Sequence, residues 1–428
     1  MSCAPWRAVP GRAYFFEKLL MKSFFFLRLF AVVFALTASG CASLPGCAPV
    51  APVILVSIDG FKPEYLQRGI TPRLSRFAAL GVRAEAMRPS FPTVTFPNHY
   101  TLVTGLHPDR HGIVGNTMED PAIPGVRFSL GNKEAQLDRR WWDQAEPVWV
   151  TAEKNQVRTA IMFWPGSEAP IHGVRPGDYR KYDGKRELAD RVDTLLSWLE
   201  RPAGTRPGFL ALYFEDIDEA GHAYGPDSPE LAAALGHVDL AIGRLLDGLG
   251  TRGVAANIVI VSDHGMANTS AERVVRLPEV APPDSYRLIT YGPYAGLEAV
   301  AGKEAVLAAA LLRQHEHMQC WRKDNLPARF HFGKNPRVPQ FICLAETGWV
   351  IRPADVPGRP MKSAGGHGFD QDALEMQALF LAAGPGFRQG TVLKSLEAVD
   401  VYPLLMKLLA LPALPSDGSL NATAPALR

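Results

Sequence analysis

The sequence has few cysteines, almost no net charge and no internal repeat. Its 428 residues include five cysteines, and no pair of them has zinc-finger spacing. A bound metal would therefore have to be held by carboxylates and histidines. The formal net charge of +2 arises near the N-terminus, and nothing in the chain predicts a nucleic-acid-binding surface.

The main long apolar run lies near the N-terminus. The basic start Met21-Lys22, an apolar run over 24–36 and small residues up to Cys41 are typical of an export signal. We expect translation to start at Met21, with residues 1–20 as an upstream extension. Cys41 resembles a lipoprotein cleavage site, and ordinary cleavage just before it is an equal alternative. A retained membrane anchor ranks third, because Arg28 interrupts a run that is short for a span. The predicted protein is exported, either periplasmic or membrane-anchored as a lipoprotein.

Short apolar runs recur through the rest of the chain, separated by segments with helical patterning. The runs predict buried strands at Val53–Ile58, Val157–Phe163, Phe209–Phe214, Asn257–Ser262 and Ala378–Ala382. Helices are predicted at Pro72–Leu80, Glu187–Leu199, Pro229–Leu249 and Val399–Leu411. This alternation predicts an α/β fold with a mostly parallel central sheet and helices on both faces. In such sheets, active sites form beyond the carboxyl ends of the strands.

Residues 267–364 do not follow this pattern. They are rich in proline and contain one clear helical segment, Lys303–His315, so we expect an inserted smaller subdomain. An oxidising compartment would allow Cys320 and Cys343 to form a disulfide, which their spacing alone does not decide. The predicted parts are an upstream extension and export signal (1–40), a linker (41–50), the first part of the catalytic domain (51–266), the inserted subdomain (267–364), the return of the catalytic domain (365–412) and a loose tail (413–428).

Acidic residues and histidines follow three of the predicted strands. Because parallel strands end at one edge of a sheet, these side chains are expected to converge there, together with a histidine from a glycine-rich loop. Carboxylates buried together without a cation would repel each other, and a pair of zinc ions about 4 Å apart would remove that cost. Each motif alone could be an ordinary turn or helix start, but their joint placement favours a two-metal site. The candidates are Asp59, Asp218, His222, Asp263, His264 and His367.

A hydroxyl residue, Thr95, stands just before Pro97 at a predicted helix start. Backbone N–H groups at a helix start attract anions, so a phosphate could sit beside this hydroxyl. Threonine is a weak nucleophile that needs an activator such as a metal ion. Ser90, Thr93 and Thr101 are rival nucleophiles, and His99 and His111 are expected to support the loop.

Taken together, the motifs resemble the nucleotide pyrophosphatase/phosphodiesterases of the alkaline phosphatase superfamily, with bacterial exported members as the nearest likeness. The resemblance covers roughly residues 50 to 411. The matching stretches are Ile58-Asp59-Gly60-Phe61, Thr95-Phe96-Pro97-Asn98-His99-Tyr100, Leu102-Val103-Thr104-Gly105-Leu106-His107-Pro108, His111-Gly112-Ile113-Val114-Gly115-Asn116, Phe163-Trp164-Pro165-Gly166-Ser167, Asp218-Glu219-Ala220-Gly221-His222, Ser262-Asp263-His264-Gly265-Met266 and Gly366-His367-Gly368.

The resemblance implies an alkaline-phosphatase-like fold and a role for each matching residue. It implies Thr95 as the nucleophile of a phospho-threonine intermediate, and Asn116 as a hydrogen-bond donor to a phosphate oxygen. It implies an aromatic slot for a nucleoside, matched here by Phe96, Tyr182 and Tyr213. The two implied zinc sites are Asp59, Thr95, Asp263 and His264 for one ion, and Asp218, His222 and His367 for the other.

The expected activity is zinc-dependent hydrolysis of nucleotide phosphodiester or pyrophosphate bonds. Three alternatives remain open at this point. The same core could act on phospholipid headgroups, such as choline or lysophospholipid diesters. It could act as a phosphomonoesterase or phosphonate hydrolase, although no arginine beside Thr95 is evident to bind a terminal phosphate. The protein could also be an inactive surface binding protein. The oligomeric state is left open.

Overall fold

The computed structural model of the chain describes residues 51–353 and 364–428. The predicted export signal and Cys41 lie outside these described residues. Within the described ranges, no helix combines the length and the apolar character needed to cross a membrane.

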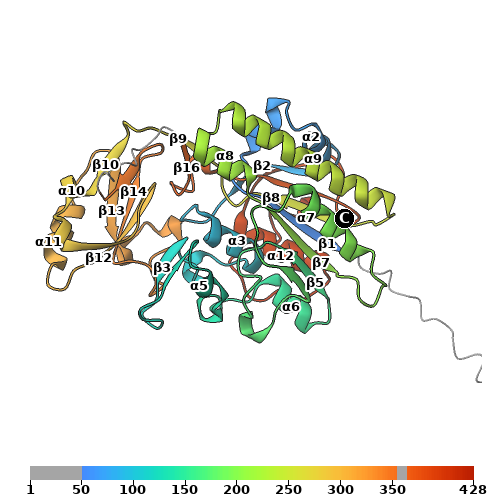
Figure 1. Cartoon of the computed structure of the whole chain (residues 1–428), viewed down its shortest axis with the longest axis horizontal. Coiled ribbons are helices and arrows are strands. Elements are labelled where there is room, and N and C mark those ends of the chain that lie inside the picture. The colour runs from blue at the N-terminus through green and yellow to red at the C-terminus, as the bar shows by residue number, and fades with distance from the viewer. Residues whose placement is uncertain (1–50, 354–363) are drawn as a thin grey trace, which may run out of the picture. The chain divides into compact units, whose positions relative to one another are not determined.

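An eight-stranded sheet forms the centre of the fold, as the sequence predicts (Figure 1). Each strand runs parallel to its neighbours except β17, which is antiparallel to both strands beside it. The inner strands are apolar and fully buried because helices cover both faces of the sheet. In spatial order the strands are β18 (Thr391–Glu397), β2 (Val82–Arg88), β17 (Phe380–Ala383), β8 (Asn257–Val261), β1 (Val53–Ile58), β7 (Phe209–Phe214), β5 (Thr159–Met162) and β6 (Asp178–Arg180).

The reversed direction of β17 places the segment before it at the edge of the sheet where β1, β7 and β8 end, which is the predicted catalytic edge. Because β17 runs opposite to β8 and β1, it begins at the edge where those two strands end. The chain reaches that edge through β16 (Ala364–Gly366), which pairs with β9 (Ala267–Thr269) just after β8. This pairing explains how His367, which precedes β17, can lie near Asp59 and Asp263, which follow β1 and β8. The sequence pattern did not predict this reversal.

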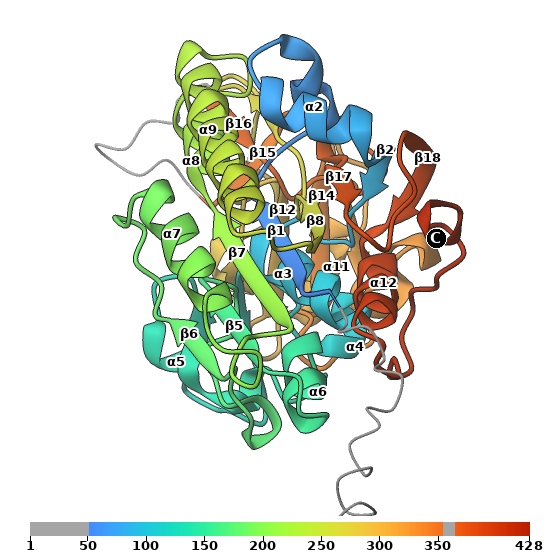
Figure 2. The ribbon, with the colours of Figure 1, turned by 90° about the vertical axis from the view of Figure 1, so that its right-hand side faces the viewer.

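Helices cover the two faces of the sheet through alternating strand residues. Ile54 and Val56 of β1 belong to one buried cluster, and Val53 and Leu55 belong to the other. Views from two directions show the helices on opposite sides of the strands (Figures 1 and 2). On the first face lie α2 (Pro72–Leu80), α7 (Leu188–Leu199), α8 (Asp216–Tyr224) and α9 (Pro229–Thr251). On the second face lie α3 (Thr95–Thr104), α6 (Val148–Lys154) and α12 (Val401–Leu408).

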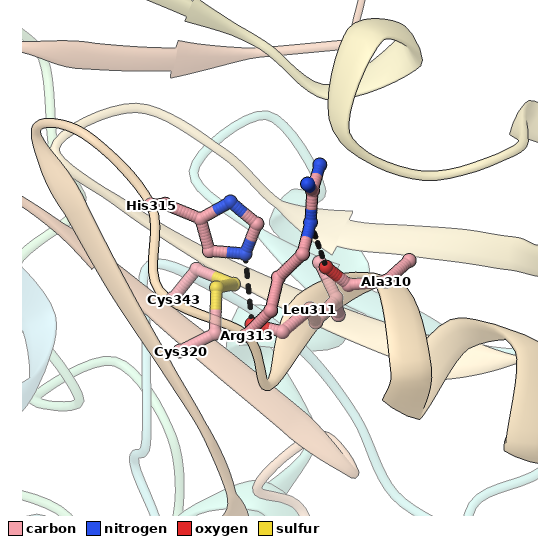
Figure 3. Close-up of a disulfide and its surroundings, with 6 residues drawn as sticks. All are labelled: Ala310, Leu311, Arg313, His315, Cys320 and Cys343. Carbon is pink, nitrogen blue, oxygen red and sulfur yellow. Dashed lines mark hydrogen bonds between the residues drawn. A yellow bond between two sulfur atoms is a disulfide. The ribbon is translucent and has the colours of Figure 1, made fainter.

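Residues 286–345 contain a smaller antiparallel sheet. Its strands, in spatial order, are β11 (Tyr286–Thr290), β12 (Tyr294–Ala299), β14 (Phe341–Ala345) and β13 (Met318–Arg322). Cys320 and Cys343 stand directly opposite each other on β13 and β14 and form a disulfide (Figure 3). The structure thereby decides the pairing that the sequence left open. Tyr294 and Ile342 belong to the same buried cluster as Val53, so this sheet shares a core with the main one.

The predicted helix Lys303–His315 is too long. The observed α11 spans Glu304–Leu311, and the chain folds back directly after it. His315 Nε2 lies 3.0 Å from the Leu311 carbonyl oxygen, and Arg313 Nε donates to the Ala310 carbonyl at 3.3 Å (Figure 3). Side chains thus satisfy carbonyls that a further helical turn would have used.

The tail after Pro412, expected to be loose, is held against the body. Asp417 accepts a hydrogen bond from the His107 backbone at 2.9 Å and forms an ion pair with Arg110 at 2.6 Å. Thr423 and Ala426 are buried. The expectation rested on the small and polar composition of the tail. Composition does not show the specific contacts that Asp417, Thr423 and Ala426 make.

Further short α-helices and strands lie between these elements. They are α4 (Pro108–His111), β3 (Thr117–Glu119), β4 (Arg127–Ser129), α5 (Lys133–Leu137), β10 (Val274–Arg276), α10 (Leu277–Val280) and β15 (Val350–Arg352).

Candidate metal centre and active site

Asp59 directly follows β1, in a turn that lies close to two other acids, Asp218 and Asp263. Its side chain is 1% exposed, and Oδ2 accepts a hydrogen bond from the Tyr213 hydroxyl at 2.7 Å. Gly60 has φ +72°, and a Cβ there would lie 3.1 Å from the Asp218 backbone. Glycine is needed at this position, both for the positive φ and for the close approach to Asp218. Gly60 N–H also donates to Asp263 Oδ1 at 3.3 Å.

Asp263 and His264 follow β8 and are fully buried. His264 Nε2 lies 3.0 Å from Asp263 Oδ2 and 3.6 Å from Asp59 Oδ1. Burial, reinforced by the charges of Asp263 and Asp218, raises the pKa of Asp59 well above its usual range. Burial acts in the same direction on Asp263, but His264 and His99 outweigh it and hold its pKa well below the usual range. A cation between these carboxylates would relieve their repulsion.

Helix α8 and the loop before β17 supply the other three predicted ligands. Asp218 and His222 are four residues apart on one face of α8, with His222 Nε2 3.5 Å from Asp218 Oδ2. His367 Nε2 lies 3.5 Å from Asp218 Oδ1 and 2.9 Å from His222 Nε2. The convergence predicted for these three residues is therefore present.

Hydrogen bonds to backbone carbonyls fix which ring nitrogen of each histidine faces the centre. Nδ1–H of His367 donates to Thr93 O at 2.9 Å, that of His222 to Gly365 O at 3.2 Å and that of His264 to Gly265 O at 3.0 Å. In the neutral rings, each Nε2 therefore presents a lone pair to the centre. Such carbonyl partners are typical of metal-bound histidines.

Several atoms at the centre are buried without a hydrogen-bond partner among the described residues. They are Asp59 Oδ1, Asp218 Oδ1, Asp263 Oδ2 and His264 Nε2. Buried acceptors normally find a donor or an ion, and oxygen and imidazole nitrogen are ligands that zinc accepts. The donor set fits divalent cations.

The ligand atoms fall into two groups, each within 4.8 Å: Asp218, His264 and His367, and Asp59, His99 and Asp263. His264 joins the group of His367, whose ring stacks on it at 3.6 Å, and it also contacts both acids of the other group. The two predicted ligand sets are therefore adjacent, with His264 between them.

His99 supports the start of α3, where the predicted nucleophile Thr95 lies. Its Nδ1–H donates to Thr95 O at 2.9 Å and lies 3.3 Å from Asp263 Oδ2, while Nε2 accepts from the Ser57 hydroxyl at 2.8 Å. Both ring nitrogens are thus engaged, and neither presents a free lone pair to a metal. The residue ties the start of α3 to Asp263.

Thr95 is the first residue of α3, and its side chain is 9% exposed. In the described part of the chain, its hydroxyl makes no hydrogen bond. The three rival hydroxyls are all engaged elsewhere: Ser90 with His107, Thr93 with the Phe369 carbonyl and Thr101 with His111. Only Thr95 therefore combines a free hydroxyl with a place at the helix start.

Asn116 lies beside Thr95. Its Oδ1 accepts from the Phe96 backbone N–H at 2.8 Å. This bond uses the amide oxygen, so the Nδ2 group is left to donate to another acceptor.

Among the three aromatic residues predicted to form a slot, Tyr182 and Tyr213 are neighbours, with ring centroids 6.5 Å apart. Phe96 packs against Phe128 and Trp142, at 5.7 and 6.1 Å. That all three residues form one slot stays a prediction. Tyr213 is buried and its hydroxyl holds Asp59, whereas Tyr182 is 39% exposed.

A family model described as type I phosphodiesterase/nucleotide pyrophosphatase matches residues 53–370. The chain belongs to this family. An uncharacterized pyrophosphatase/phosphodiesterase of Schizosaccharomyces pombe is 37% identical over 390 residues, which cover 88% of this chain and 80% of the relative. The bis(5'-adenosyl)-triphosphatase of Xenopus laevis is 36% identical over 375 residues, covering 87% of this chain and 80% of the relative.

A solved structure of a family member shows the same fold. Murine ectonucleotide pyrophosphatase/phosphodiesterase 5, an inactive variant in complex with AMP, has a TM-score of 0.84 and 33% identity; the match covers 88% of this chain and all of that one. The predicted alkaline-phosphatase-like α/β fold is confirmed. As a member of this family, the protein is a hydrolase of phosphodiester or pyrophosphate bonds.

Sequence reasoning missed the residue that shapes the loop before Thr95. Asn98 is fully buried; its Oδ1 accepts from Ser90 N–H, and its Nδ2 donates to the carbonyls of Ser90, Pro92 and Val94. One amide thereby satisfies four backbone groups just before Thr95. Asn98 lies one residue after Pro97, in the first turn of α3. This position is the sequence signal that could have pointed to its role in holding the loop.

Proposed function

We propose that the protein is a zinc-dependent nucleotide pyrophosphatase/phosphodiesterase that acts through a phospho-threonine intermediate. The main support is the convergence of six predicted acids and histidines. His99 links this centre to the start of α3, because it contacts both Asp263 and the carbonyl of Thr95. Asp59, Thr95, Asp263 and His264 would hold one zinc ion, and Asp218, His222 and His367 the other. Zinc at this centre would lower the pKa of an oxygen that it contacts and offset the charge of a phosphate.

Thr95 would be the attacking group. Its Oγ1 forms a bond to phosphorus, its proton is lost to solvent, and the bond between phosphorus and the leaving oxygen breaks. Water then cleaves the threonine ester and regenerates the hydroxyl. His99 holds the start of α3 in place through the Thr95 carbonyl.

Asn116 and the helix start would bind the non-bridging oxygens. Because Asn116 Oδ1 accepts from Phe96 N–H, its Nδ2 group is available to donate to a phosphate oxygen. The N-terminus of α3 adds a favourable field for the negative charge.

The nucleotide substrate is proposed from the relatives and from Tyr182. One relative is named as a diadenosine triphosphatase, and a neighbouring structure holds AMP. Tyr182 exposes an aromatic ring beside Tyr213, and such a ring can stack on a nucleobase. The export signal predicted from the sequence supports action outside the cytoplasm.

A comparison of chromogenic esters tests this proposal. The p-nitrophenyl ester of thymidine 5'-monophosphate should give a kcat/KM about tenfold or more above that of p-nitrophenylphosphocholine and of p-nitrophenyl phosphate, because only its base can stack. Chelation should remove the activity and added zinc should restore it. Faster hydrolysis of the choline ester would favour a headgroup phosphodiesterase, and faster hydrolysis of the monoester a phosphatase.

A further inference from the structure

A buried ion pair lies at the catalytic edge and has no part in the proposed chemistry. Glu215 directly follows β7, and Arg191 comes from α7; their side chains are 7% and 2% exposed. Arg191 Nη1 donates to Glu215 Oε2 at 2.5 Å, and Nη2 donates to Oε1 at 2.7 Å. Burying two charges costs desolvation free energy that an apolar pair would not cost. Fold stability is therefore a weak reason for this pair.

The remaining donors of Arg191 hold the segment that follows β6. Its Nε donates to the Arg186 carbonyl at 2.9 Å, and Nη1 donates to the Tyr213 carbonyl at 3.1 Å. The planar guanidinium thus joins the 182–186 segment to the end of β7.

Tyr182 lies at the end of this network. Its hydroxyl donates to Glu215 Oε1 at 3.2 Å, and its backbone N–H donates to Glu168 at 2.9 Å. Its ring packs edge-on against Phe163, over which the Arg191 guanidinium lies at 5.0 Å. Burial and the Glu215 charge raise the pKa of Tyr182, so the hydroxyl keeps its proton and remains a donor.

Although it is anchored at its hydroxyl, the Tyr182 ring remains accessible. It is 39% exposed and lies beside Tyr213, whose hydroxyl holds Asp59. The Nζ of the exposed Lys133 lies 5.0 Å from the ring centroid, so flexible groups can reach the face of the ring. The ring is thus fixed in orientation close to the candidate metal centre.

We infer that the Arg191–Glu215 pair is a positioning device that holds the Tyr182 ring as a platform for the planar base of the substrate. The pair thereby sets the preference for nucleoside diesters over diesters without a base. This inference rests on the proposed function, in which Tyr182 belongs to the aromatic slot.

The first test removes one atom from the network. Tyr182→Phe keeps the ring and loses only the hydroxyl bond to Glu215. KM for the p-nitrophenyl ester of thymidine 5'-monophosphate should rise roughly three- to tenfold, with kcat unchanged. Methyl p-nitrophenyl phosphate has the same leaving group and no nucleoside, and its kinetic constants should not change.

A second variant tests the ion pair itself. Arg191→Lys keeps the charge but loses the fork that holds two carbonyls and the carboxylate, so it should raise the same KM at least as much. Arg244→Lys is the matched control, because Arg244 also makes a two-pronged pair, with Asp193, on the exposed surface of α9 and α7. The control should leave both esters unaffected.

The possible outcomes distinguish a failure of this inference from a failure of the proposed nucleotide phosphodiesterase activity. An unchanged ratio of the two KM values in both variants, even with a lowered melting temperature, would show a merely structural pair and overturn the inference alone. Equal rises for both esters would do the same. A wild-type enzyme that hydrolyses neither ester would overturn the proposed function and this inference together.

Discussion

Replacing Thr95 with alanine is expected to abolish turnover, with kcat lowered by roughly a thousandfold or more. The substitution removes the only hydroxyl at the helix start that is free of other hydrogen bonds within the described residues. The zinc content should stay largely intact, because the six acids and histidines proposed as zinc ligands remain. Steady-state kinetics on a nucleotide diester and zinc analysis of the same sample would measure both effects.

Thr101→Ala is the matched control for this experiment. Thr101 lies on the same helix, and its hydroxyl bonds to His111, away from the centre. The control should retain most of the activity. If the Thr95 variant kept full activity, or if the Thr101 variant lost it, the assignment of the nucleophile would be wrong.

His367→Ala is expected to lose one of two zinc ions and at least about a hundredfold in kcat. The substitution deletes the Nε2 lone pair that lies 3.5 Å from Asp218 and 2.9 Å from His222. Two side chains are too few to hold a tetrahedral ion tightly. The zinc content per chain, measured after dialysis, should fall from two toward one.

His237→Ala provides a comparison for the loss of a histidine in general. His237 is exposed on α9 and belongs to neither group of candidate ligands. This variant should keep two ions and normal activity. Two tightly held ions in the His367 variant would show that the ion near Asp218 does not depend on His367.

The parts of the fold that follow from local pattern could be predicted from the sequence. Val53–Ile58 and Phe209–Phe214 are short, mainly apolar runs, preceded by proline or glycine and followed by an acidic residue, and their bounds match β1 and β7. Parallel strands end at the same edge of a sheet, and this rule predicted that Asp59 and Asp263 lie close together. The structure places β1 and β8 side by side and parallel, with Gly60 N–H bonded to Asp263.

The parts that depend on distant contacts could not be predicted. The reversal of β17 follows from the path of a long insertion, and the place of His264 between the two ligand groups depends on side-chain directions. The Tyr213 hydroxyl reaches Asp59 across 154 positions, and Asp417 fixes the tail through His107. Such contacts leave no period or spacing in the sequence.

The central claim is that two cations lie between these acids and histidines. The most direct measurement is anomalous X-ray diffraction at the zinc absorption edge from crystals of the zinc-loaded protein. The account predicts two strong peaks about 4 Å apart, one beside Asp59, Asp263 and His264 and the other beside Asp218, His222 and His367. A single peak, or peaks away from these six side chains, would contradict it.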